Sequence, residues 1–171
     1  FEAAGGYKGL IIDLRNNPGG LLDSAVKVAD KFIDSGVIVS TKSRIASENK
    51  SFSAKSNTTV IKKNIPIVVL INKGSASASE ILAGALKDNN KATLVGTKTY
   101  GKGIIQELNK LSDGSGLKVT VSEYYTPNHT AINKIGITPD VEVELSDEAK
   151  KQSNLEEKDD NQLQKAIDML K

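Results

Sequence analysis

Three serines and one lysine stand out as residues whose types and spacing could do chemistry. Ser75, Ser77 and Ser79 alternate with alanine in the stretch GSASASE, and Lys102 lies between two glycines in TYGKGIIQ. A serine hydroxyl becomes a nucleophile when a neighbouring base takes its proton, and an uncharged lysine can be that base. The sequence therefore suggests covalent catalysis on a carbonyl group.

The surroundings of Lys102 favour the role of base. A lysine accepts a proton only when it is uncharged, and burial favours the uncharged form. Glycines flank Lys102, and Ile104 and Ile105 follow, so we expect it to be packed inside the protein. Gln106 lies four residues after the lysine. One helical turn would bring the amide oxygen of Gln106 near the ammonium, where it could orient Lys102 without adding a charge.

The serines also have a purely structural interpretation. Ser77 and Glu80 have the spacing of a capping box, in which the serine hydroxyl accepts an N–H from the first turn of a helix. Ser75 could cap the same helix. A nucleophile at a helix N-terminus would in turn have unpaired N–H groups beside it to stabilise negative charge. The residues alone leave open which serine, if any, is the nucleophile.

Other chemistries fit less well. Residues 96–102 read G-x-x-x-x-G-K, but Gly103 stands where a phosphate-binding loop needs Ser or Thr for Mg²⁺. An S-x-x-K pattern at residues 47–50 lacks the S-D-N and K-T-G motifs that accompany it in penicillin-binding enzymes. His129 is the only histidine and lies in a turn-like polar stretch. A Ser–Lys pair is therefore favoured over nucleotide binding and over a Ser–His pair.

The composition excludes several classes of function. The chain has 171 residues, 38% of them hydrophobic, with a net charge of +2, which suffices for one packed core. Basic residues form no stripe of the kind that nucleic acids need. The absence of cysteine and the single histidine exclude thiolate and multi-histidine metal sites, and we expect no cofactor. The longest apolar run, 65–71, is too short to cross a bilayer.

Hydrophobic patterning predicts an α/β fold with parallel strands at its centre. Strand patterns at 9–14, 65–71 and 91–96 alternate with helical spacing at 21–36 and after residue 77. Sites in such sheets form at the carboxyl ends of the strands, where RNNPGG and NKGSAS both lie. Further strand or hairpin patterns occupy residues 37–42, 43–58, 104–126 and 136–145, and a short amphipathic helix occupies 162–170.

Three separated stretches resemble the carboxyl-terminal processing, or tail-specific, serine proteases. They are GLIIDLRNNPGG, NKGSASASEILAGALKDNNKATLVGTKTYGKGIIQ, and LKVTVSEYYTPN with GITPDVEVEL, and they span about residues 7–145. The resemblance implies that Ser77 is the nucleophile, Lys102 the general base and Gln106 the residue that orients it. It thus selects one serine among three.

The resemblance also implies how the oxyanion is held. Backbone N–H groups would stabilise it, one from Ala78, next to the nucleophile, and one from Gly19 or Gly20. The two glycines lie in the NNPGG stretch, whose backbone is free to turn its amides toward a ligand.

Fold, substrate and partners follow from the same resemblance. It implies a core similar to crotonase and Clp protease, built of ββα units around a parallel sheet, in a serine endopeptidase that cleaves proteins near their C-termini. The alternative is a non-catalytic peptide-binding or scaffold fragment of that fold. Family members usually carry an upstream PDZ domain, which we expect to lie outside this sequence, and usually work outside the cytoplasm. We assign residues 1–145 to the protease core and 146–171 to a charged linker and amphipathic helix that could serve a homodimer.

Overall fold

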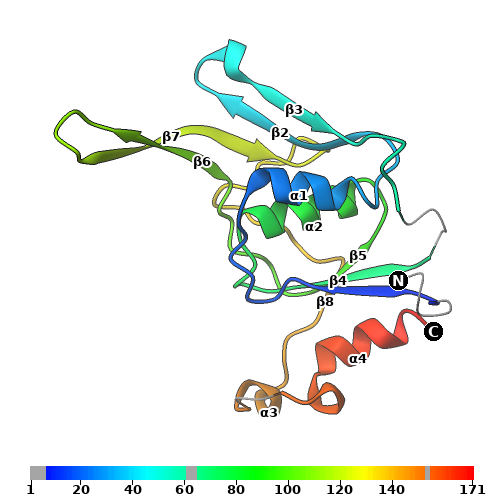
Figure 1. The fold of residues 1–171 in the computed structure, drawn as a ribbon. Coiled ribbons are helices and arrows are strands. Elements are labelled where there is room, and N and C mark those ends of the chain that lie inside the picture. Colours follow the sequence, from blue (N-terminus) through cyan, green and yellow to red (C-terminus); the bar gives the residue numbers. More distant parts are fainter. Residues whose placement is uncertain (1–6, 61–64, 153–154) are drawn as a thin grey trace.

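Two four-stranded sheets form the framework of the protein (Figure 1). The computed structural model describes residues 7–60, 65–152 and 155–171. Sheet A is parallel, with the strand order β1-β4-β5-β8, and sheet B is antiparallel, with the order β3-β2-β7-β6. The predicted α/β class with a parallel sheet is confirmed. The strands are β1 (Leu10–Asp13), β2 (Val37–Ser43), β3 (Lys50–Ser53), β4 (Ile67–Ile71), β5 (Thr93–Gly96), β6 (Ile104–Lys110), β7 (Gly116–Tyr125) and β8 (Val141–Glu142).

Strand β4 is the centre of the core. All five of its residues are buried, because β1 and β5 flank it and helices cover both of its faces. Val69 and Ile71 belong to the apolar cluster on the side of α1 and α2, whereas Val68 and Leu70 belong to the cluster on the side of α4. An unbroken apolar run is typical of a parallel strand that is buried on both faces.

Helices α1 (Leu22–Ala29) and α2 (Ala78–Asp88) lie between the two sheets (Figure 1). The expected helix at 21–36 ends early, at Ala29, because the N–H groups of Lys31 and Phe32 bond three residues back, to Val28 and Ala29, and tighten the chain into turns. This tightening still buries Ile33 completely. The remaining helical elements are η2 (Ala46–Glu48), α3 (Asp147–Lys150), η3 (Glu157–Asp159) and α4 (Asn161–Asp168).

Sheet B extends into two hairpins. Strand β2, expected at 37–42, forms a hairpin with β3. Strand β3 and η2, which lies in the turn, belong to the polar segment 43–58, where we expected a surface excursion or hairpin. Strands β6 and β7 form the long hairpin expected around the turn at 112–116, and it projects far from the helices (Figure 1). The strand expected at the end of the stretch 136–145 is reduced to the two residues of β8.

The C-terminal segment packs on the core. Helix α4 lies on the face of sheet A opposite α1 and α2 (Figure 1), where Ala166 is completely buried together with Val68, Leu70 and Val95.

None of the helices in the described part of the chain has the length and apolar character needed to span a membrane.

Candidate active site

The loops that follow β1 and β4 meet at the carboxyl edge of sheet A, because the two strands are parallel neighbours. The Asn16 N–H donates to Asn72 Oδ1 at 2.9 Å, and Asn72 Nδ2 donates to Asn16 Oδ1 at 3.0 Å. The Ala76 N–H donates to the Asn17 carbonyl at 3.0 Å. These bonds join the 14–21 loop to the start of α2, as the sequence predicted for this edge.

The structure separates the three serines. Ser75 is completely buried, and its Oγ donates to the Leu14 carbonyl at 2.6 Å and accepts the Asn72 N–H at 3.0 Å. Ser79 is buried in the first turn of α2. Ser77 immediately precedes α2 and is partly exposed. Ser77 is therefore the serine of the three that a substrate can reach from solvent.

Ser77 sits at a sharp bend between strand and helix. Its φ of 55° and ψ of −117° are rarely adopted by residues other than glycine, and such conformations cost about 1–3 kcal/mol and cluster at active sites. The Ser77 N–H donates to Glu80 Oε2 at 2.9 Å. This bond is the carboxylate half of the capping box that the spacing of Ser77 and Glu80 predicted.

The Glu80 carboxylate connects this bend to the segment that carries Lys102. Glu80 is completely buried. Its Oε1 accepts the Thr99 hydroxyl at 2.5 Å and the Gly101 N–H at 2.7 Å, and its Oε2 accepts the N–H groups of Ser77 at 2.9 Å and Lys102 at 2.8 Å. The sequence indicated only a capping role for Glu80. The bonds to residues 99–102 depend on contacts between distant segments, which spacing did not reveal.

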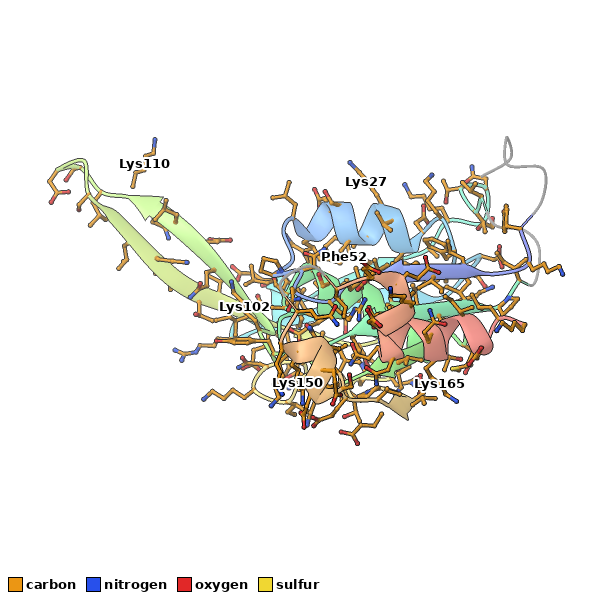
Figure 2. The ribbon with its side chains drawn as sticks, turned by 90° about the horizontal axis from the view of Figure 1, so that it is seen from below. Lys27, Phe52, Lys102, Lys110, Lys150 and Lys165 are labelled. Carbon is orange, nitrogen blue, oxygen red and sulfur yellow. The ribbon has the colours of Figure 1, made fainter. Side chains whose placement is uncertain are left out.

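The side chain of Lys102 is exposed, so the prediction that it packs inside is wrong. The flanking glycines are buried instead, because the backbone itself packs closely here. A Cβ on Gly103 would lie 2.2 Å from the Asn133 nitrogen. Figure 2 shows Lys102 at the base of the β6–β7 hairpin, with Lys110 near its tip. Within the described part of the chain, no hydrogen bond or ion pair holds the Lys102 ammonium.

Gln106 lies on strand β6, so the expected helical turn between Lys102 and Gln106 is wrong. Its side chain is exposed, and Nε2 donates weakly to Thr120 Oγ1 at 3.4 Å. Gln106 is paired in register with Thr120 of β7. The structure thus brings the backbones of Ser77 and Lys102 together and leaves Gln106 paired with β7.

The candidate oxyanion donors lie around the same bend. Gly19 has a φ of +89°, and a Cβ there would lie 2.4 Å from the Ala76 carbonyl oxygen and 2.7 Å from the Ala78 nitrogen, so only glycine fits. The Gly19 N–H donates to Asn17 Oδ1 at 2.9 Å. A Cβ on Gly20 would meet nothing within 4 Å, which places its backbone beside open space.

A small apolar hollow of about 180 Å³ opens next to these glycines and to Ala78. A larger hollow of about 770 Å³ lies at the opposite, amino edge of sheet A, and no candidate residue borders it. Among the described residues, no group of three or more His, Cys, Asp or Glu side chains could hold a metal ion. The small hollow is lined by Leu14, Asn17, Gly19, Gly20, Leu21, Ser24, Ala25, Val28, Ala78, Ser79 and Leu82.

The model of the protein family "Peptidase family S41" matches residues 1–143. The chain belongs to peptidase family S41. It is 51% identical over 137 residues to a carboxy-terminal-processing protease of Bartonella bacilliformis, covering 80% of the chain and 31% of that protein. With a carboxyl-terminal-processing protease of Synechocystis it shares 52% identity over 139 residues, covering 81% and 32%. The resemblance seen in the sequence is confirmed.

Solved structures agree with this S41 membership. The photosystem II D1 C-terminal processing protease superimposes with a TM-score of 0.76 at 44% identity, covering 84% of the chain and 36% of that protein. A Bacteroides fragilis protein assigned to the S41 proteases superimposes with a TM-score of 0.77 over 98% of the chain and 46% of its own, at 19% identity, which shows the shared fold. The chain spans about a third of the length of the curated relatives it matches.

Proposed function

We propose that this chain is the catalytic core of a serine endopeptidase that cleaves proteins near their C-termini, with Ser77 as the nucleophile and Lys102 as the general base. One observation carries the assignment. A single buried carboxylate oxygen of Glu80 accepts the backbone N–H of both residues. Nucleophile and base are thereby anchored to one fixed point, although they are distant in sequence.

The chemistry begins with a proton transfer. The uncharged Lys102 amine takes the Ser77 hydroxyl proton while Oγ attacks the peptide carbonyl carbon. The resulting ammonium gives this proton to the leaving amine as the C–N bond breaks, which leaves an acyl group on Ser77. Water, deprotonated by Lys102, then attacks the ester carbonyl. The Lys102 ammonium returns the proton to Ser77 Oγ as the C–O bond to the acyl group breaks and the new carboxyl terminus leaves.

Backbone N–H groups stabilise the oxyanion in each half of this reaction. Ala78 supplies the first, since it opens α2, where N–H groups have no partner within the helix. Gly20 is favoured over Gly19 for the second. The Gly19 N–H already bonds to Asn17, whereas Gly20 faces open space. The apolar hollow beside Gly20 and Ala78 would take a small apolar side chain of the substrate.

Two assignments rest on the family resemblance. Gln106 is proposed to orient Lys102, and an upstream PDZ domain is proposed to present substrate tails. A bound peptide and the rest of the longer protein would cover the exposed Lys102 and exclude water from it, which favours the uncharged amine. We further propose that the enzyme works outside the cytoplasm, and that residues 146–171 contribute to any homodimer.

A fluorophosphonate probe, read out by intact mass and peptide mapping, tests the proposal. Wild-type protein should be labelled at Ser77, and Ser77→Ala should not be labelled. Lys102→Ala should be labelled about 10²–10⁴-fold more slowly, the usual contribution of a general base. The matched control is Lys98→Ala, since Lys98 is a nearby exposed lysine. Labelling that persists in Ser77→Ala would contradict the proposed nucleophile, and a folded wild type that resists the probe would favour the non-catalytic alternative.

A further inference from the structure

Arg15 joins the candidate site to the C-terminal helix. Its Nε and Nη2 donate to Asp13 Oδ1 at 3.0 Å and Oδ2 at 2.7 Å, and its Nη1 donates to Asp160 Oδ1 and Gln162 Oε1, each at 3.0 Å. Arg15 Nη2 also lies 2.7 Å from Asp160 Oδ2. The Arg15 and Asp160 side chains are only 12% and 6% exposed, so water and salt screen this two-pronged pair weakly.

Asp160 serves α4 at the same time. Its Oδ1 accepts the N–H groups of Gln162 and Leu163 at 3.1 and 3.0 Å, which makes it the N-cap of the helix. One carboxylate therefore caps the first turn of α4 and also holds the Arg15 guanidinium, which comes from the other end of the chain. The pairing fixes where the first turn of α4 lies relative to Arg15.

Helix α4 runs antiparallel to β1 across the outer face of sheet A. Its first turn lies beside Arg15, which follows β1, and Leu170, just past its end, packs on Gly9, which precedes β1. A Cβ on Gly9 would lie 2.8 Å from Leu170 Cδ2. The N-terminus of α4 is thereby placed at the carboxyl edge of the sheet (Figure 1). Ser77 follows β4 at the same edge.

Arg15 directly precedes the residues of the 14–21 loop that bond to the segment before Ser77. The next two residues bond to the segment before Ser77, through Asn16 with Asn72 and through the Asn17 carbonyl with the Ala76 N–H. The Asn17 side chain then holds the Gly19 N–H. The position of Gly19 and Gly20 beside Ser77 therefore depends on a segment whose first side chain is anchored by α4.

We propose that Asp160 is a positioning residue, which acts through Arg15 to hold the 14–21 loop where the Gly20 N–H faces the substrate carbonyl. The catalytic part of this inference rests on the proposed function above. Asp160 lies outside residues 1–143, which match the family model, so the C-terminal helix would be a working part of the catalytic unit rather than an appendage to it.

Asp160→Asn is the informative variant. Asparagine still caps a helix, and Asp13 still pairs with Arg15, so no buried charge is left bare. The matched control is Asp168→Asn, which removes an exposed carboxylate at the other end of α4, where it pairs with Lys171 at 2.8 Å. Hydrogen–deuterium exchange of residues 14–21 reports loop position without requiring activity. Fluorophosphonate labelling of Ser77, separated into probe affinity and maximal rate, reports catalysis.

We expect Asp160→Asn to raise exchange in the 14–21 loop about tenfold and to lower the maximal labelling rate about tenfold, with unchanged probe affinity. Asp168→Asn should change neither, and Asp160→Glu should recover part of the rate. Unchanged exchange in Asp160→Asn, with α4 still helical by circular dichroism, overturns the positioning role. An unchanged labelling rate overturns its catalytic part. A wild-type protein that is never labelled counts against the proposed function, and the exchange result still decides whether Asp160 holds the loop.

Discussion

The backbone N–H of Lys102 donates to a buried carboxylate oxygen of Glu80 at 2.8 Å, and the same oxygen accepts the N–H of Ser77. The main chain thus fixes the two candidate catalytic residues at one buried point. Ser77 is partly exposed, and Lys102 is exposed. A site held in this way keeps its geometry before a substrate arrives.

Glu80→Gln should destabilise the protein by about 3 kcal/mol and greatly slow the labelling of Ser77. The four donors on the Glu80 carboxylate all require an acceptor, and an amide turns an NH₂ group toward two of them, which leaves buried N–H or O–H groups unpaired. Urea denaturation measures the stability. Glu107→Gln, an exposed change on β6, is the control, and an equal effect there would remove the special role of Glu80.

Thr99→Val tests the same network from its other side. The Thr99 hydroxyl donates to Glu80 Oε1 at 2.5 Å and accepts the Ile137 N–H at 2.7 Å. Valine keeps the shape but orphans that buried N–H, so the free energy of unfolding should fall by about 2 kcal/mol. Thr99→Ser keeps the hydroxyl and should lose less. If the two variants unfold at the same urea concentration, the hydroxyl contributes nothing.

The fold could be predicted because its signals are local. Strand β4 is an apolar run bounded by turn residues, and both loops at the carboxyl edge are rich in glycine, asparagine or serine. The lengths of the helices and strands were less predictable than their positions. The pattern that suggested a helix to residue 36 continues past Ala29 because Ile33 is buried in a turn rather than in a helix.

The site was less accessible to prediction. Family resemblance, and not spacing, selects Ser77, since Ser75 is also a serine followed by alanine. What distinguishes Ser75 is its bond to the Leu14 carbonyl, which follows β1. Lys102 was expected inside because its neighbours are apolar, but close packing of the glycine backbone turns its side chain outward. The contact between Arg15 and Asp160 joins residues 145 positions apart, and no pattern in the sequence indicated it.

Ser77→Gly should be more stable than Ser77→Ala by about 1 kcal/mol, although both should resist the fluorophosphonate probe. The φ of 55° at this bend strains alanine as it strains serine, and glycine relieves that strain. The difference corresponds to about 2–4 °C in Tm for a domain of this size, which calorimetry can resolve. An alanine variant as stable as the glycine variant would show that the bend relaxes without cost.

Low pH should weaken the contact between Asp160, at the start of α4, and Arg15, in the loop of the candidate site. Burial raises the pKa of Asp160, but hydrogen bonds from Arg15 and the Leu163 N–H outweigh it and keep the pKa below the ordinary value of 3.8. Because the pKa of Asp160 is lower in the folded state, its charge stabilises the fold. This stabilisation is fully present above the ordinary value of 3.8 and is lost as the pH falls through the lower pKa of the folded state. Wild type should therefore exceed Asp160→Asn in urea denaturation near neutral pH, and the gap should close only below about pH 4. A gap that stays constant to lower pH would mean that the Asp160 charge does not stabilise the contact with Arg15.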